Sequence, residues 1–443
     1  MHTLKQSLTI LLSTVLTLLI ANSFLFLRDH RWSLLIMIPI LLAVVLLSGL
    51  CTIRTHSLRL RLCHHGVVLL SVFQLSGMVG ILYHLVLAIF MIPDDLLPFS
   101  GSILQCVLVE GLLFLVGILC LYATSLQLGI RRRILGILCG MLPVLNLLIL
   151  NRMIAIAAEE VRFELEKEQV NDRRAHLKLC QTRYPLLLVH GVFFRDSKHF
   201  NYWGRIPKEL ERNGATVYYG EHQSADAIAN SAQEIADRVL RIVSDTGCGK
   251  VNIIAHSKGG LDCRYAIDRL GLGEYVASLT TVSTPHRGCL FADYLLEKAP
   301  DELKQKVART YNTALKKLGD PAPDFLAAVN DLRSTACTPL DRSMPQPSGI
   351  VCQSVGSLMS KATSGRFPLD LTYHVVKRHD GPNDGLVRED SFRWGDRYTL
   401  LEPTTSEGIS HADMVDLDRK NIRGFDVREF YVQLVADLKN RGL

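Results

Sequence analysis

Ser257 is the residue whose neighbours most clearly predict a chemical role. It lies in Ala255-His256-Ser257-Lys258-Gly259, directly after a β-type apolar run and directly before an amphipathic helical one. A nucleophilic serine sits on a tight strand-to-helix turn, where the residues two before and two after must be small because the elements crowd. Ala255 and Gly259 are both small. The segment therefore predicts a nucleophile elbow, with the helix N-terminus favouring negative charge beside Ser257.

A second candidate segment lies near the start of the same region. The apolar run after Tyr184 ends at His190-Gly191. In α/β hydrolases the loop at this place supplies one backbone N–H of an oxyanion hole, and the residue after the nucleophile supplies the other. We expect these two amides to be those of Val192 and Lys258. We interpret His190 as a residue that hydrogen-bonds within the loop and shapes it.

Five segments in a fixed order carry a family resemblance. They are Pro185–Gly191, Ala255–Gly260, Ser283–Gly288, Gln353–Ser357 and Asn383–Val387. In this order they resemble the motifs of bacterial triacylglycerol lipases and esterases of the α/β-hydrolase fold. The resemblance covers residues 184–443 and has no counterpart for the apolar N-terminal region.

The resemblance implies a catalytic triad in the chain order serine, acid, histidine. Asp384, in Asn-Asp-Gly-Leu-Val, matches the acid, and Asp380 is a weaker neighbour. His411, on a late loop before the last helix, matches the base. It would take the proton of Ser257 while Asp384 holds its tautomer. Three other histidines are set aside, one as structural and two because they precede Asp384: His286, His374 and His379.

A structural calcium ion is a further expectation from the resemblance. Many of these lipases bind one through the aspartate two residues after the catalytic histidine, and Asp413 occupies that position. No second carboxylate aligns convincingly, and Asp370 is only a guess. A loop-capping or solvated Asp413 is the alternative. No cofactor is expected for catalysis itself.

Charge is spread unevenly along the 443 residues, whose 49 basic and 43 acidic side chains leave a net charge of +6. Residues 1–151 are mostly apolar, and their few charges are mainly arginines in short loops. The remainder is nearly neutral, so the basic excess belongs to membrane-flanking loops and nucleic-acid binding is excluded. We predict a transmembrane region at 1–151, a charged helical stalk at 152–182 and a lipase-like catalytic domain at 183–443.

Five apolar runs are long enough for helices that cross a bilayer, which takes about 20 residues. They are Leu8–Leu27, Trp32–Ile53, Gly66–Ile92, Ser102–Gly129 and Ile134–Leu150. With five spans, the positive-inside rule places the N-terminus in the cytoplasm and the catalytic domain outside a bacterial cell membrane. If the fifth run, which contains Pro143, is a surface helix, the domain stays inside. Glu110, within a span, is interpreted as facing a helix interface, and a functional carboxylate is the alternative.

Beyond Tyr184, short β-type runs alternate with amphipathic segments, as in a mostly parallel α/β sheet. An insertion between Phe291 and Leu340 carries helical patterns and is expected to cap the site. The leading hypothesis is a membrane-anchored serine hydrolase of lipid esters that forms an acyl-enzyme. Two alternatives stay open. One is an acyltransferase with the same triad, and the other is a membrane sensor, transporter or scaffold whose hydrolase-like domain is not catalytic.

Overall fold

The computed structural model describes residues 1–443 apart from 1, 28, 92–95, 141, 193–200 and 403–406. The chain divides into two compact units, Met1–Asp172 and Arg173–Leu443. The division falls within the segment that the sequence predicts as a stalk. We call the first the helical unit and the second the sheet unit.

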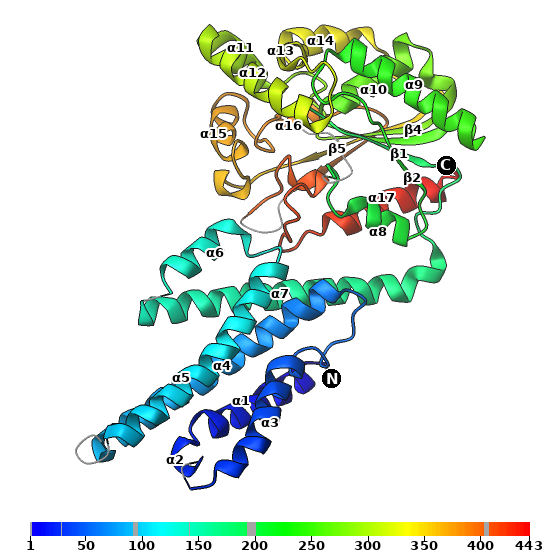
Figure 1. Ribbon diagram of the computed structural model, residues 1–443. Coiled ribbons are helices and arrows are strands. Elements are labelled where there is room, and N and C mark those ends of the chain that lie inside the picture. The colour runs from blue at the N-terminus through cyan, green and yellow to red at the C-terminus, as the bar shows by residue number, and fades with distance from the viewer. Residues whose placement is uncertain (1, 28, 92–95, 141, 193–200, 403–406) are drawn as a thin grey trace. The chain divides into compact units, whose positions relative to one another are not determined.

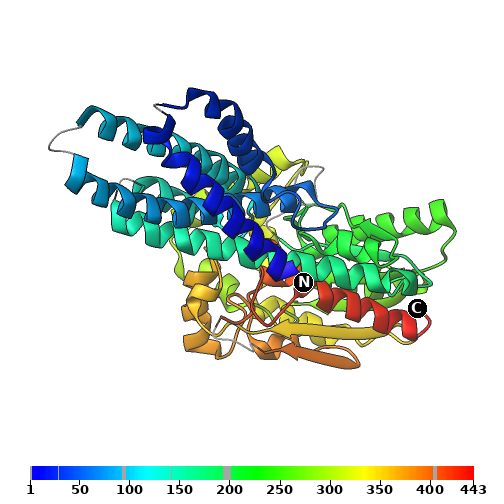
Figure 2. The same ribbon diagram turned by 90° about the horizontal axis from the view of Figure 1, so that it is seen from below.

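The helical unit contains two long apolar helices, α4 and α5, which run side by side in both views (Figures 1 and 2). In the described part of the chain, these two helices alone are long and apolar enough to cross a membrane. Its elements are α1 (His2–Ala21), α2 (Phe24–Leu27), η1 (Arg31–Ser33), α3 (Leu34–Leu47), α4 (Leu58–Met91), α5 (Leu96–Thr124), α6 (Gly129–Leu138) and α7 (Pro143–Arg174).

The fifth predicted span is not a single helix in the structure. The run is divided between α6, which ends at Leu138, and α7, which begins at Pro143. A proline is tolerated in the first turn of a helix because its missing N–H would have no partner there. It cannot continue a preceding helix without loss of a hydrogen bond. The first and second predicted spans correspond to shorter apolar helices, Lys5–Ala21 and Leu34–Leu47, so the five-span topology is corrected at three of its five runs.

Two buried glutamates connect the helices of this unit. Glu110 on α5 accepts a hydrogen bond from Ser76 Oγ on α4 at 3.0 Å, which agrees with a residue facing a helix interface. Glu160 on α7 accepts from Arg59 Nη1 at 2.6 Å and from Ser125 Oγ at 2.7 Å. A carboxylate with such partners can be buried because its charge is compensated. Glu160 therefore connects α7 to α4 and to the residue that follows α5.

The sheet unit is built on six parallel strands in the order β2-β1-β3-β4-β5-β6. The strands are β1 (Leu186–Val189), β2 (Val217–Tyr219), β3 (Val251–His256), β4 (Val276–Val282), β5 (Val351–Ser357) and β6 (Arg397–Leu401). Four of these strands match the apolar runs that the sequence indicates. With the helices between them they form an α/β-hydrolase sheet, which confirms the predicted fold class.

Helices cover both faces of this sheet, because successive strand residues point to opposite sides. Leu187 and Ile253 pack toward α9 (Ile228–Thr246) and α10 (Lys258–Arg269). Leu186 and Ile254 pack toward the opposite face, where α8 (Ile206–Arg212) and α17 (Val427–Asn440) lie (Figure 1). Both faces are thus buried, as a parallel sheet requires.

The predicted insertion forms a helical cap with a core of its own. The cap helices are α11 (Leu290–Lys298), α12 (Asp301–Leu318), α13 (Phe325–Asp331) and α14 (Ser334–Ser343). Their buried side chains pack with Val192, Leu261 and Val387, which flank the predicted site residues. The cap core is therefore continuous with the loops that carry the candidate chemistry. The remaining elements are η2 (Ala175–Leu177), η3 (Leu272–Tyr275), η4 (Ala362–Ser364), α15 (Leu369–Asp380), α16 (Glu389–Phe392) and η5 (Asp413–Val415).

Candidate active site

Ser257 occupies a strained turn between β3 and α10. Its backbone has φ 53° and ψ −128°, a combination that costs a non-glycine residue about 1–3 kcal/mol. The turn is fixed from both sides, because Ser257 N donates to Val282 O of β4 at 2.9 Å and Gly260 N donates to Ser257 O at 3.1 Å. The predicted elbow is therefore present in the backbone. Strain of this kind persists where the surroundings over-determine it, and it clusters at functional sites.

Two glycines allow the loop after β1 to approach this turn. A Cβ on Gly259 would lie 2.4 Å from His190 O, and a Cβ on Gly191 would lie 2.8 Å from Ser257 Cβ. Real Cβ atoms do not tolerate such distances, so both positions require glycine. The loop that carries Val192 is thus held against the elbow that carries Lys258. This proximity is what an oxyanion hole built from their two amides needs.

Asp384 and His411 meet although 27 residues separate them. The Asp384 carboxylate is fully buried, and its Oδ2 lies 2.7 Å from His411 Nδ1. Its Oδ1 accepts from the amides of Leu386 at 3.1 Å and Val387 at 2.9 Å. The backbones are joined as well, by His411 N donating to Asp384 O at 2.8 Å. A carboxylate held this way fixes the imidazole tautomer with its proton on Nδ1 and leaves Nε2 as the basic nitrogen.

The alternative acid and bases stand elsewhere. Asp380 forms an ion pair with Arg388, at 3.7 Å between Oδ1 and Nη1. His374 and His379 lie on α15, where the ring of His374 packs edge-on against that of Tyr373. His190 is fully buried, with its Nδ1 2.9 Å from Gly191 O, which agrees with the loop-shaping role expected of it.

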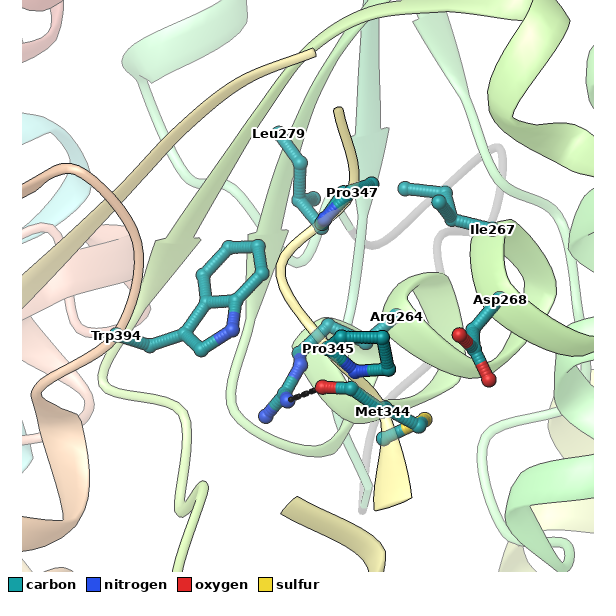
Figure 3. Close-up of a pocket in the computed structure, with 8 residues that line it drawn as sticks. All are labelled: Arg264, Ile267, Asp268, Leu279, Met344, Pro345, Pro347 and Trp394. Carbon is teal, nitrogen blue, oxygen red and sulfur yellow. Dashed lines mark hydrogen bonds between the residues drawn. The ribbon is translucent and has the colours of Figure 1, made fainter. Parts of the chain in front are cut away.

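His286 belongs to a second polar cluster, on the cap side of α10. Arg264 Nη1 donates to His286 Nδ1 at 2.9 Å and to Asp341 Oδ1 at 2.8 Å, and its guanidinium stacks over Trp394. Arg264 and Trp394 both line a small cavity (Figure 3). Its volume of about 10 Å³ leaves room for one water. Burial and then the nearby arginines hold the pKa of His286 well below its usual range. Its structural role, expected from the sequence, follows from these bonds.

Lys258 carries a buried ion pair directly behind the elbow. Its Nζ lies 2.7 Å from Asp262 Oδ1 and 3.0 Å from Ser231 Oγ, and both charged side chains are almost fully buried. Burial raises the pKa of Asp262 to about 7, and the ammonium of Lys258 acts in the opposite direction. The pair fixes the first turn of α10 and hence the direction of the Lys258 amide.

Two residues at the site were missed in the sequence. Tyr202 and His256 are both buried, and Tyr202 Oη lies 2.6 Å from His256 Nδ1. His256 occupies an unspecified position of the elbow motif, so its type gave no signal. Tyr202 lies beyond the loop after β1, and its contact with His256 spans 54 residues.

Asp413, the residue predicted to bind calcium, has the hydrogen bonds of a loop-capping side chain. Its Oδ2 accepts hydrogen bonds from Ser410 N at 2.9 Å and Ser410 Oγ at 2.7 Å, which is a loop-capping arrangement. Ca²⁺ takes six to eight oxygen ligands. Of the residues that the structure describes, no group of three or more histidines, cysteines or acids could hold a metal ion. The calcium ion has no further part in the chemistry derived below.

The chain is similar in sequence to curated triacylglycerol lipases. No protein-family model matches the chain. A triacylglycerol lipase of Pseudarthrobacter phenanthrenivorans is 34% identical over 176 residues, which are 37% of this chain and 54% of that protein. A triacylglycerol lipase of Pseudomonas fragi is 27% identical over 297 residues, which are 59% of this chain and 98% of that protein. The sheet unit resembles triacylglycerol lipases.

The extent of this resemblance is limited by coverage. The chain spans about half the length of two of the curated lipases that it matches, 54% and 49%. The crystal structure of Staphylococcus hyicus lipase superposes with a TM-score of 0.47 at 16% identity, over 59% of this chain and 97% of that one.

Proposed function

We propose that the sheet unit hydrolyses carboxylic esters of lipids through the triad Ser257, His411 and Asp384. The observation that carries this proposal is the 2.7 Å contact of buried Asp384 with His411, on a loop that also contacts the residue preceding Ser257. Such a pair prepares His411 Nε2 to remove a proton from a hydroxyl. In the elbow motif Ala255–Gly259, the one hydroxyl side chain is that of Ser257.

In the proposed mechanism, Ser257 Oγ attacks the acyl carbon while His411 takes its proton. The amides of Val192 and Lys258 donate to the oxyanion, and each such donor is worth about 10²–10³ in kcat. The tetrahedral intermediate collapses as His411 returns the proton to the leaving alcohol, giving an acyl-enzyme. Water activated by His411 then releases the acid. Similarity to triacylglycerol lipases supports a lipid ester as substrate.

Labelling with a fluorophosphonate probe tests the nucleophile in the full chain in detergent. We expect wild type to be labelled, Ser257→Ala to lose both labelling and turnover, and Ser283→Ala to keep both. Ser283 is the matched control, because it also has a positive φ of 49° and directly follows a neighbouring strand, β4. A folded wild type that is neither labelled nor active would overturn the proposal.

Substrate class and acyl acceptor are tested with p-nitrophenyl esters from acetate to palmitate. Turnover that increases toward long chains supports a lipase, and turnover confined to acetate restricts the unit to an esterase. Glycerol added as a second acceptor separates hydrolysis from acyl transfer. Transfer to glycerol in preference to water would replace the hydrolase proposal by an acyltransferase.

We also propose that the helical unit anchors the protein in a membrane. α4 and α5 have the length for this role, and the arginines before and within the first turn of α4, Arg54, Arg59 and Arg61, favour a cytoplasmic position for that end. The extracytoplasmic placement expected from the sequence needed the fifth span. With an even number of spans the sheet unit lies on the cytoplasmic side. Protease protection of the C-terminal unit in intact cells supports this placement, and digestion from outside would overturn it.

A further inference from the structure

His256 is the residue immediately before the nucleophile, and its ring lies between two loops of the site. It is 1% exposed and ends β3. Its Nδ1 is 2.6 Å from Tyr202 Oη, and its Nε2 is 3.2 Å from the backbone oxygen of His411. The rings of His256 and His411 also pack together, with centroids 4.6 Å apart. His256 thus contacts both Tyr202 and the loop of the base.

The protonation of this ring follows from its partners. A carbonyl oxygen can only accept, so His256 Nε2–H donates to His411 O. Burial, and then His411 itself, hold the pKa of His256 well below its usual range, so the ring is neutral and its Nδ1 is an acceptor. Tyr202 O–H therefore donates to Nδ1. One tautomer satisfies both bonds, and the other would place two lone pairs against each other at His411 O.

Tyr202 extends the same chain of bonds to the oxyanion loop. Gly191 N–H donates to Tyr202 Oη at 3.3 Å. Gly191 directly precedes Val192, whose amide is a proposed oxyanion donor. The bonds therefore run in one direction, from Gly191 N–H through Tyr202 O–H and His256 Nε2–H to His411 O. They join the loop of the oxyanion hole to the loop of the base behind Ser257.

His411 is held at three points once this bond is included. Its ring Nδ1 is held by Asp384 Oδ2, its backbone N–H by Asp384 O, and its backbone oxygen by His256. The first two bonds both come from Asp384. The third comes from a different segment, the end of β3, and holds the carbonyl of the same residue.

We propose that Tyr202 and His256 are positioning residues that hold the oxyanion loop and His411 in register around Ser257. The proposal rests on the proposed function of this triad. Neither residue touches the reacting atoms, and both act through Gly191 and His411. Their loss is expected to lower kcat and to leave KM unchanged, because they affect the transition state and not the substrate surface.

Tyr202→Phe is the first test, in the full chain in detergent with a p-nitrophenyl ester. It removes the hydroxyl that donates to His256 Nδ1 and accepts from Gly191 N–H. We expect kcat to fall ~10²-fold, the loss that a misplacement of about 1 Å causes, with KM unchanged. Wild-type kcat in a folded Tyr202→Phe would overturn the proposal.

Tyr431→Phe is the matched control. Tyr431 is fully buried in the same apolar cluster, and its hydroxyl donates to Met414 O at 2.9 Å, three residues from His411. Both changes delete one buried hydroxyl, so both are expected to lower the urea midpoint of unfolding. Only Tyr202→Phe is expected to lower kcat. Equal losses of kcat in the two variants would reduce Tyr202 to a structural role and overturn the proposal.

Substitutions of His256 separate its bond to Tyr202 from its bond to His411 O. His256→Gln keeps a donor near the position of Nε2, and His256→Asn keeps only an acceptor near Nδ1. We expect the glutamine variant to retain kcat within about tenfold of wild type and the asparagine variant to fall as far as Tyr202→Phe. The reverse order would overturn the assignment of the Nε2–H bond. These tests require that wild type turns over the ester and that Ser257→Ala abolishes this turnover. If wild type shows no such turnover, the triad proposal itself is overturned.

Discussion

Two buried histidines of the sheet unit sit in polar clusters of similar make-up and acquire opposite properties. His411 lies beside Asp384, at 2.7 Å, and His286 lies beside Arg264, at 2.9 Å. Each has a charged neighbour at hydrogen-bond distance through Nδ1. The sign of that neighbour makes the difference. A carboxylate can only accept, so His411 Nδ1 carries the proton, whereas a guanidinium can only donate, so His286 Nδ1 carries the lone pair.

The charged neighbour also determines the state of the second ring nitrogen, Nε2. In His411 the Nε2 lone pair is available for a proton from Ser257. In His286 the Nε2–H is used toward Thr281 Oγ1, at 3.1 Å, and no basic nitrogen remains. A histidine near a nucleophile is therefore a candidate base only when the group on its other nitrogen is an acceptor. The sequence analysis set His286 aside as structural, and its hydrogen bonds give the physical reason.

The largest effect is expected from reversing the acceptor beside His411. Asp384→Asn keeps the shape of the side chain but can present an N–H to Nδ1, which stabilises the wrong tautomer. We expect kcat to fall ~10⁴-fold, as such a change does in a serine triad, with little change in folding. Steady-state turnover of a p-nitrophenyl ester measures it.

Asp380→Asn is the control for this change. Asp380 is four residues away and pairs with Arg388, so its substitution is expected to leave kcat at the wild-type value. A loss at Asp380 that equals the loss at Asp384 would mean that the acid has been assigned to the wrong residue.

The second largest expected effect is a loss of folding stability when Arg264 is removed from the cluster around His286. Arg264→Met removes the donor shared by His286, Asp341 and the backbone oxygen of Met344. Because the guanidinium is buried, we expect unfolding to become easier by about 3–5 kcal/mol. Fluorophosphonate labelling of the folded fraction should persist, since the triad is untouched.

Arg269→Met provides the matched change at the end of the same helix. Arg269 is exposed and pairs with Asp268 at 3.0 Å, so the cost of its loss is expected to be below about 1 kcal/mol. Urea unfolding of both variants, followed by tryptophan fluorescence, compares the two costs. Equal costs would show that the buried cluster contributes no more than a surface ion pair.

Much of the site could be predicted because its parts are local patterns. The elbow motif Ala255–Gly259 is contained in five consecutive residues, and the same turn appears in the structure, although the close approach that requires Gly259 involves the distant His190 O. The Asn-Asp-Gly-Leu-Val segment also folds locally, since Asp384 Oδ1 accepts from the two amides that follow its glycine. A motif of this kind carries its own geometry wherever the sheet places it.

The remainder depends on contacts between distant segments. Tyr202 and His256 are ordinary residues in the sequence, and their meeting depends on how the loop after β1 returns to the end of β3. β5 and β6 carry no long apolar run of their own, and they join the sheet by pairing with β4 and with β5, respectively. The interruption of the fifth apolar run at Pro143 was visible, but composition alone could not decide between a kink and two helices.

The smallest effect expected is a pH dependence of stability that distinguishes the two histidines further. Burial, and then Arg264 and Arg287, lower the pKa of folded His286 well below the ordinary value of 6.5. Below pH 6.5 the unfolded chain binds a proton at this residue and the folded chain does not, so stability falls as the pH falls. The slope for one such group is at most about 1.4 kcal/mol per pH unit.

His286→Asn isolates this contribution, because its Oδ1 can still accept from Arg264 but does not titrate. At pH 7.5 the stability difference between wild type and His286→Asn reflects packing alone. At pH 5 wild type should have lost part of its advantage, and the urea midpoints at the two pH values measure how much. A difference that stays constant would mean that folded His286 binds a proton as readily as the unfolded chain. His286 would then carry a basic nitrogen after all, and only its position, not its hydrogen bonds, would separate it from His411.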